Sequence, residues 1–318
     1  MRKANGLGAE ETLLEFSTAK YPSPVTIGSL LYMGRELLAR KGIGNAAEEA
    51  SWLLQAGLGL TRLALHVEGG KLLSQQERVR VLGLLGRRAR FEPLQYILGT
   101  QEFCGLEFIV TPAVLIPRPE SELLVRESVR FAEHRPAPLL VDVGTGSGCI
   151  ATAVATQLSG SAIYATDISA AALTVARANA ERHGVGERIR FLEGDLLAPL
   201  KQLGLEHQIS IVLSNPPYIP DEMLEGLQPE VARYEPRLAL TGGFDGLLLH
   251  RRLLREAAVY LESGGLLLLE VGEGQADKIA AVAENLGVYC NSEILKDDAG
   301  ISRVVRLERN SATLPWTR

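Results

Sequence analysis

Cysteine is scarce in this chain of 318 residues, which contains only Cys104, Cys149 and Cys290. Three widely separated cysteines cannot build a disulfide framework, and their spacing matches no zinc motif. The five histidines also lack the spacing of metal ligands, so we expect no metal site. This cysteine usage is typical of a reducing compartment, and we expect a cytoplasmic protein.

Long apolar runs and a strong charge of one sign are also missing. No stretch reaches the roughly eighteen apolar residues that a membrane span needs, and the first residues lack the apolar core of a secretory signal. Lys and Arg number 33 against 38 Asp and Glu, which gives a net charge of −5. That balance provides no general attraction to nucleic acid, so any basic surface must be local.

Four regions of different character follow one another along the chain. Residues 1–24 carry weak signals and are expected to be an extension. Residues 25–92 show helical apolar periodicity without a strand-like run, which predicts a small all-α domain. Residues 93–119 contain two short strand-like runs around Gly105 and predict a β-hairpin linker. Residues 120–318 alternate strand and helix and form the predicted main domain.

The predicted helical domain contains two candidate helix caps and a cluster of arginines. Asn45 with Glu48, and Ser74 with Glu77, have the spacing of capping boxes. The helix after Ser74 carries an arginine cluster, which is either a solvated helix face or a contact surface for an acidic protein or RNA. The cluster comprises Arg78, Arg80, Arg87, Arg88 and Arg90.

The alternation in residues 120–318 predicts an α/β fold with a Rossmann-like, seven-stranded sheet. The segment 296–300 between the last two strands is too short for a helical crossover, so that pair must be antiparallel. We therefore expect a mostly parallel sheet with one antiparallel strand near its edge. The predicted strands are 139–143, 162–166, 189–193, 209–213, 266–271, 289–295 and 304–307, with helices near 148–158, 169–183, 245–262 and 274–286.

A glycine-rich turn follows the first predicted strand of this sheet. Its sequence is Asp142-Val143-Gly144-Thr145-Gly146-Ser147-Gly148, and its three glycines permit a tight turn with backbone open to a ligand. A buried Asp142 would repel a pyrophosphate and suits a ligand with an ammonium group. A strand-end cap is the structural alternative for Asp142.

Acidic residues also follow the next two predicted strands. Asp167 is placed to accept hydrogen bonds from the hydroxyls of a ribose, and a helix N-cap is its structural alternative. Asp195 offers a carboxylate, and Leu196 an apolar neighbour, where an adenine would lie. Together with the glycine-rich turn, these residues predict a nucleoside-type pocket at the carboxyl edge of the sheet.

The fourth predicted strand runs into Asn215-Pro216-Pro217-Tyr218. Two prolines stiffen the loop and direct its carbonyls outward. The Asn215 side-chain oxygen and the Pro216 carbonyl are then two fixed acceptors beside the ring of Tyr218, which suits a planar NH2 group. Asn-Pro also starts ordinary turns, so this loop in isolation would predict only a turn.

These motifs together resemble a class I S-adenosylmethionine-dependent methyltransferase that acts on an NH2 group. Further segments narrow the resemblance to the peptide chain release factor glutamine methyltransferase family, over about residues 26–308. One departure is Ser121, where the family usually has threonine; both side chains carry a hydroxyl. The segments that carry the resemblance are 93–99 (PLQYILG), 115–120 (LIPRPE), 234–240 (YEPRLAL), 242–246 (GGFDG) and 298–303 (DAGISR).

The resemblance implies a cofactor, a substrate and a role for several residues. Gly144, Thr145, Gly146, Ser147, Gly148 and Asp167 would hold S-adenosylmethionine. Residues 215–218 would hold the glutamine of a Gly-Gly-Gln loop in class I release factors, and the helical domain would assist in recognising this partner. We expect a monomer that needs neither a membrane nor direct contact with nucleic acid.

Other candidate residues carry weaker signals. Phe103 and Arg118 are candidates for substrate binding, but hairpin packing and electrostatics at a helix start explain them nearly as well, and the second explanation also covers Glu120. Glu270 is expected to be structural. Two sibling activities stay open, methylation of a ribosomal protein glutamine and of adenine N6 in nucleic acid. A non-enzymatic scaffold that binds S-adenosylmethionine is disfavoured by the two aimed acceptors at Asn215 and Pro216.

Overall fold

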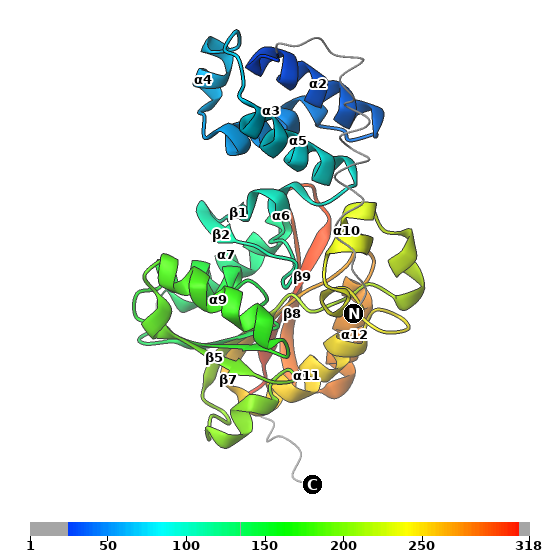
Figure 1. The fold of residues 1–318 in the computed structure, drawn as a ribbon. Coiled ribbons are helices and arrows are strands. Elements are labelled where there is room, and N and C mark those ends of the chain that lie inside the picture. Colours follow the sequence, from blue (N-terminus) through cyan, green and yellow to red (C-terminus); the bar gives the residue numbers. More distant parts are fainter. Residues whose placement is uncertain (1–24, 134, 312–318) are drawn as a thin grey trace, which may run out of the picture. The chain divides into compact units, whose positions relative to one another are not determined.

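The computed structural model describes residues 25–133 and 135–311, coloured by position in the sequence in Figure 1. They fall into two compact units, with the boundary between Gly99 and Thr100. The extension expected for residues 1–24 lies outside the described residues. Within the described part of the chain, every helix is too short or too polar to cross a membrane.

The first unit consists of helices only. Thr26 and Ser29 close a capping box at the start of α2, and Ser74 and Glu77 close the predicted one at the start of α5. The capping box predicted for Asn45 is wrong, because its backbone (φ −98°, ψ 37°) is not extended and its side chain caps no amide. The helices are α2 (Ile27–Arg40), α3 (Ala46–Leu58), α4 (Arg62–Val67), α5 (Gln75–Ala89) and α6 (Leu94–Leu98).

The arginine cluster on α5 serves partly inside this unit. Arg88 is only 6% exposed and forms an ion pair with Glu49 of α3, while Arg87 pairs with Glu92 at 2.5 Å. A buried charge needs such a partner, so Arg88 links two helices. Both interpretations of the cluster, a solvated face and a partner surface, are therefore wrong for Arg88.

A β-hairpin opens the second unit, as the sequence predicts. Strands β1 (Thr100–Phe103) and β2 (Leu106–Ile109) pair antiparallel around Cys104 and Gly105, whose φ angles of 51° and 73° suit a tight two-residue turn. The Asn179 side chain binds both the amide and the carbonyl of Ile109, at 2.7 and 2.9 Å. The hairpin is thereby fixed to α9 (Ala170–Arg182) of the main sheet domain.

Seven strands form the sheet of the second unit, in the order β5-β4-β3-β6-β7-β9-β8. Every neighbouring pair is parallel except the two that include β9, which confirms the predicted sheet with one antiparallel strand next to its edge. The strands are β3 (Leu139–Val143), β4 (Ala162–Asp167), β5 (Ile189–Glu193), β6 (Ile209–Ser214), β7 (Leu261–Glu270), β8 (Tyr289–Lys296) and β9 (Ser302–Arg309).

Helices cover both faces of this sheet, so its central strands are apolar on both sides. Alternate residues of β6 belong to different cores: Ile211 and Leu213 lie in one cluster and Val212 in the other. The first cluster receives side chains from α7, α8 and α9, and the second from α11 and α12. These helices are α7 (Glu122–Ala132), α8 (Cys149–Gln157), α9 (Ala170–Arg182), α11 (Leu248–Tyr260) and α12 (Ala276–Leu286).

Strand β7 begins at Leu261, five residues before its predicted start at 266. Gly264 and Gly265 suggest a turn in the sequence, but here they carry an irregularity in the pairing of β7 with β6. A Cβ on Gly265 would lie 2.9 Å from the Glu262 carbonyl oxygen and 3.0 Å from that of Ile209. Glycine therefore lets the strand continue through this irregularity.

Short helical turns fill the long connection between β6 and α11. They are η4 (Asp221–Gly226), α10 (Pro229–Tyr234) and η5 (Arg237–Ala239). The remaining short 3-10 turns, η1 (Pro119–Ser121), η2 (Gly186–Arg188) and η3 (Ala198–Gln202), precede α7, β5 and β6. Strand order changes direction between β3 and β6, which is where open α/β sheets bind ligands.

Candidate active site

A cavity of about 230 Å³ lies at this crevice, entirely within the second unit. Its walls come from the segments that follow β3, β4, β5 and β6, from the loop before η1, and from η5 and α11. The lining residues are Ala113, Val114, Leu115, Gly144, Gly146, Thr166, Asp167, Ile168, Ser169, Ala172, Gly194, Asp195, Leu196, Asn215, Pro217, Pro236, Leu238, Ala239 and Leu249.

The glycine-rich turn forms the floor of this cavity through Gly144 and Gly146. All three of its glycines have positive φ angles (72°, 56° and 76°), which residues with a Cβ rarely adopt. A Cβ on Gly148 would also lie 2.9 Å from the Ala176 Cβ of α9. Gly148 therefore lets α8 and α9 pack closely, and it does not line the cavity.

Thr145, Ser147 and Asp142 are buried behind the turn instead of lining the cavity. The Thr145 hydroxyl donates to Asp142 Oδ2 at 2.6 Å, and the amide of Ala151 on α8 donates to the same oxygen at 3.3 Å. Burial raises the pKa of Asp142 to about 7. The carboxylate thus holds the turn against α8, which fits the strand-end cap better than direct contact with a ligand.

Asp167 lies in the cavity wall at the end of β4. Its two oxygens accept from the amides of Gly146 and Ser169, each at 2.9 Å, and burial raises its pKa. Each carboxylate oxygen can accept a second hydrogen bond, so capacity for ligand hydroxyls remains. The N-cap of α9 is Ser169, whose hydroxyl accepts from Ala172, so the helix-cap alternative for Asp167 is wrong.

Asp195 and Leu196 both lie in the cavity wall after β5. Arg252 of α11 forms two hydrogen bonds with the Asp195 carboxylate, at 2.8 and 3.1 Å. Leu196 has a φ of 46°, which turns the chain sharply behind Asp195. Arg252 therefore anchors this wall to α11, a contact that no local pattern predicts.

Residues 215–218 follow β6, but only Asn215 and Pro217 line the cavity. Ser214 fixes the end of the strand, because its hydroxyl donates to the Val143 carbonyl of β3 at 2.7 Å. Pro216 is buried, and burial raises the pKa of the Tyr218 phenol to about 12. Asn215 thus lines the cavity, and Pro216 follows it in the chain without lining the cavity.

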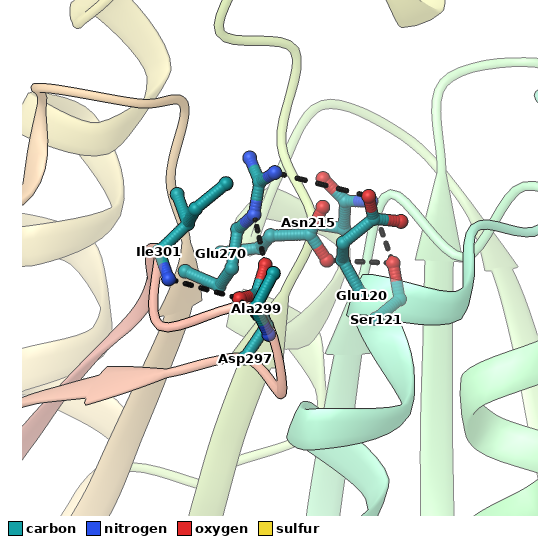
Figure 2. A network of polar contacts seen from close by, with 8 residues as sticks. Glu120, Ser121, Asn215, Glu270, Asp297, Ala299 and Ile301 are labelled. Carbon is teal, nitrogen blue, oxygen red and sulfur yellow. Dashed lines mark hydrogen bonds and ion pairs between the residues drawn. The ribbon is translucent and has the colours of Figure 1, made fainter.

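The Asn215 side chain is held by Ser121, which in turn contacts Glu270. Its amide nitrogen donates to Ser121 Oγ at 3.0 Å, and Ser121 Oγ donates to Glu270 Oε2 at 2.6 Å (Figure 2). Ser121 and Glu270 are each 2% exposed. The amide nitrogen of Asn215 therefore points into the protein, and its oxygen accepts nothing from the described residues.

Comparisons with known proteins place this site in a family. Residues 29–99 match the family model described as the PrmC N-terminal domain, and residues 121–226 match the Methyltransferase small domain. The release factor glutamine methyltransferase of Geobacter sulfurreducens is 47% identical over 284 residues, which cover 89% of this chain and 97% of that protein. The chain belongs to the release factor glutamine methyltransferase family. It is a methyltransferase of the S-adenosylmethionine type.

One further relative agrees with this family membership, and one solved structure shares the fold. The release factor glutamine methyltransferase of Moorella thermoacetica is 44% identical and covers 84% of this chain and 92% of its own length. Among solved structures, the hMettl16 catalytic domain in complex with an RNA hairpin superposes with a TM-score of 0.55, over 73% of this chain and 83% of that one. At 15% identity that likeness concerns the fold alone.

Two predicted residues lie outside the cavity of this methyltransferase. Phe103 is 1% exposed and packs edge to face on Phe108, which fits hairpin packing. Arg118 donates to Glu235 Oε1 at 2.6 Å, and the Glu235 side chain is buried. Arg118 thereby ties the loop before η1 to the segment that contains Pro236 and Leu238.

Sequence reasoning expected Glu270 to be only structural and did not single out Gln275, and the structure makes both of them functional candidates. Gln275 Nε2 donates to the Tyr218 carbonyl at 2.9 Å, so it fixes the backbone of the Asn-Pro-Pro-Tyr loop. A Cβ on Gly246 would lie 2.4 Å from the same oxygen, which explains one glycine of the 242–246 segment. Within the described residues no three His, Cys, Asp or Glu side chains are grouped to hold a metal ion.

Proposed function

We propose that this enzyme transfers a methyl group from S-adenosylmethionine to the side-chain amide nitrogen of a glutamine. The substrate is a release factor, as the names of the relatives suggest. The family resemblance further implies the glutamine of the Gly-Gly-Gln loop in class I release factors as the target. The single observation that carries the proposal is the orientation of Asn215. Its amide nitrogen is occupied by Ser121, so its oxygen is left to accept a hydrogen from an incoming NH2 group.

The residues of the cavity fit S-adenosylmethionine. Gly144 and Gly146 present backbone without side chains, Asp167 retains acceptor capacity for ribose hydroxyls, and Asp195 with Leu196 suits an adenine edge. Bound there, the sulfonium supplies an electrophilic methyl group. Asp142, Thr145, Ser147 and Gly148 support this cradle from behind.

The acceptor amide needs two hydrogen-bond acceptors. Its nitrogen is a weak nucleophile because its lone pair is delocalised into the carbonyl. The Asn215 oxygen and the Pro216 carbonyl, to which no described residue donates, would each accept one of its hydrogens. Pro217 stiffens the loop and Tyr218 would pack on the planar amide, so positioning supplies most of the acceleration and electrostatics less.

Recognition of the partner is assigned to the helical unit, residues 25–92, since the cavity itself is built without it. With a net charge of −5 and no predicted need for nucleic acid, we propose a monomeric cytoplasmic enzyme that acts on a protein.

Methyl transfer from labelled S-adenosylmethionine to a purified class I release factor tests this function. A release factor whose Gly-Gly-Gln glutamine is replaced by alanine is the matched control. Label on the first and none on the second is the expected result. Label on both would contradict the assigned target, and label on neither would move the assay to ribosomal proteins and then to adenine-containing nucleic acid.

A further inference from the structure

The polarity of the Asn215 carboxamide decides what this side chain can do. One end of the group is a carbonyl oxygen that accepts hydrogen bonds, and the other is an NH2 that donates them. If the amide were rotated by half a turn, it would present two donors to the substrate NH2 and repel it. Neighbouring residues must therefore hold the Asn215 carboxamide in one orientation.

Ser121 and Glu270 form a chain of hydrogen bonds that distinguishes the two ends. An ionised carboxylate only accepts, so the single Ser121 proton goes to Glu270 Oε2, 2.6 Å away. The Ser121 oxygen is then left as an acceptor, and it meets Asn215 Nδ2 at 3.0 Å. In both hydrogen bonds the donor lies on the Asn215 side and the acceptor on the Glu270 side. This arrangement permits only one orientation of the Asn215 amide.

The chain is anchored on rigid elements. Glu270 is the last residue of β7 and pairs with Val304 of β9, and its carbonyl accepts from His250 Nε2 at 2.8 Å. Ser121 ends the turn η1 directly before α7. A buried hydroxyl and carboxylate fixed in this way would hold the Asn215 side chain even without substrate.

We propose that Ser121 and Glu270 are positioning residues for methyl transfer, which hold the Asn215 carboxamide with its oxygen toward the acceptor nitrogen. The inference rests on the proposed function and explains how its acceptor is aimed. Neither residue touches the reacting atoms. The hydroxyl is the required group at position 121, so threonine there should serve as well as serine.

The groups around Glu270 act on its pKa in opposite directions. Burial raises the pKa of Glu270 to about 7, Glu120 adds to the rise, and the Ser121 hydrogen bond, Arg303 and Arg118 oppose it. Arg303 is itself held by Asp297 at 2.9 Å and lies 3.8 Å from Glu120. The charged or titratable groups around Glu270 are Glu120 of η1, Arg118 before it, Arg303 of β9, Tyr218 after β6 and His250 of α11.

Protonation of Glu270 would reverse the chain. A protonated carboxyl donates to Ser121, whose own proton then turns to Asn215 and favours its oxygen as the partner. Turnover of the wild-type enzyme should therefore fall as the pH is lowered through about 7. In Glu270→Gln this step should be absent, because the amide of glutamine does not titrate.

Ser121→Ala tests the inference, with Ser128→Ala on α7, the helix that follows Ser121, as its matched control. Ser128 is fully buried, and its hydroxyl has no partner among the described residues. Loss of the Ser121 hydroxyl should lower kcat for release-factor methylation by about tenfold and leave the affinity for S-adenosylhomocysteine within about twofold. Ser121→Thr should restore most of the rate, and Ser128→Ala should match the wild type.

A double variant separates positioning from general support of the fold. If Ser121 acts through Asn215, then Ser121→Ala should have no further effect in an Asn215→Ala background. Additive losses, a Ser121→Ala enzyme with normal kcat, or a parallel loss of cofactor affinity would each overturn the inference.

The side-chain amide of Asn215 gives a readout that needs no methyl acceptor. Its NH2 protons should exchange slowly with solvent in the wild type and rapidly in Ser121→Ala, as measured by NMR with signals assigned through Asn215→Ala. Unprotected protons in the wild type would overturn the positioning chain. Protected protons with no methylation of the release factor would instead reject the proposed function and leave the chain standing.

Discussion

Asp142 and Glu270 are both buried carboxyl groups, and burial raises the pKa of each to about 7. Their partners differ, however. Asp142 accepts from Thr145 and from the first turn of α8, so it serves the shape of the glycine-rich turn. Glu270 accepts from a hydroxyl that also contacts Asn215, so its charge bears on the acceptor site.

The raised pKa of Asp142 predicts a pH dependence of stability. The folded protein holds this proton more tightly than the unfolded chain, whose aspartate pKa is near 4, so stability from this group is lost as the pH rises from about 4 to 7. The free energy of unfolding of the wild type, relative to Asp142→Asn, should fall over that range by up to ~4 kcal/mol. Urea unfolding at several pH values measures this difference, and a constant difference would contradict the pKa.

The surroundings of Gly148 predict that one added methyl group at this position strongly destabilises the fold. Gly148→Ala should lower the free energy of unfolding by about 2 kcal/mol, because it strains a φ of 76° and places a Cβ 2.9 Å from that of Ala176. Gly184 has a similar φ of 69° with open space around it, so Gly184→Ala measures the backbone term alone, about 1 kcal/mol. Equal costs in urea unfolding would exclude the packing contribution.

At the scale of elements, regular buried strands could be predicted from the sequence. The runs 139–143 and 189–193 coincide with β3 and β5, because short apolar stretches bounded by turn residues leave few alternatives. Strand β7 starts earlier than predicted, since a glycine pair that suggests a turn instead carries a pairing irregularity. The short helical turns in 221–239 lack a periodic pattern long enough to detect.

The candidate site could be predicted only in part, for a related reason. Gly144, Asp167 and Asn215 each follow a strand end, so parallel topology brings them to one edge of the sheet. Ser121 is 94 residues from its partner Asn215, and Glu270 is 149 residues from its partner Ser121. No spacing rule connects residues so far apart in the sequence. Their contact depends on side-chain packing after the chain has folded.

The Arg118–Glu235 pair joins two wall segments of the cavity and predicts a coupled loss. Arg118→Ala would leave a buried carboxylate unpaired, which should lower the free energy of unfolding by about 3 kcal/mol and weaken binding of S-adenosylhomocysteine. The double variant Arg118→Met with Glu235→Gln should recover most of the stability. Calorimetry of unfolding and binding measures both effects. Unchanged stability and unchanged S-adenosylhomocysteine affinity in Arg118→Ala would show that the ion pair does not stabilise the cavity wall.

At the scale of the whole molecule, the cavity and the helical bundle belong to separate units. All the lining residues fall within 113–249, and residues 25–99 have an apolar core of their own. A protein that begins at Thr100 should therefore keep its affinity for S-adenosylhomocysteine within about threefold and lose most methylation of the release factor. Calorimetry and labelled methyl transfer measure the two properties. Full activity of the shortened protein would contradict a recognition role for residues 25–92.

The central claim is that Asn215 aims a glutamine nitrogen at the methyl donor. Mass spectrometry of the Gly-Gly-Gln peptide, after incubation of a release factor with wild-type or Asn215→Ala enzyme, tests it most directly. We expect one added methyl group on the glutamine with the wild type, and a rate at least about a hundredfold lower with Asn215→Ala at unchanged S-adenosylhomocysteine affinity. A methyl group elsewhere in the release factor, or an Asn215→Ala enzyme as fast as the wild type, would contradict the account.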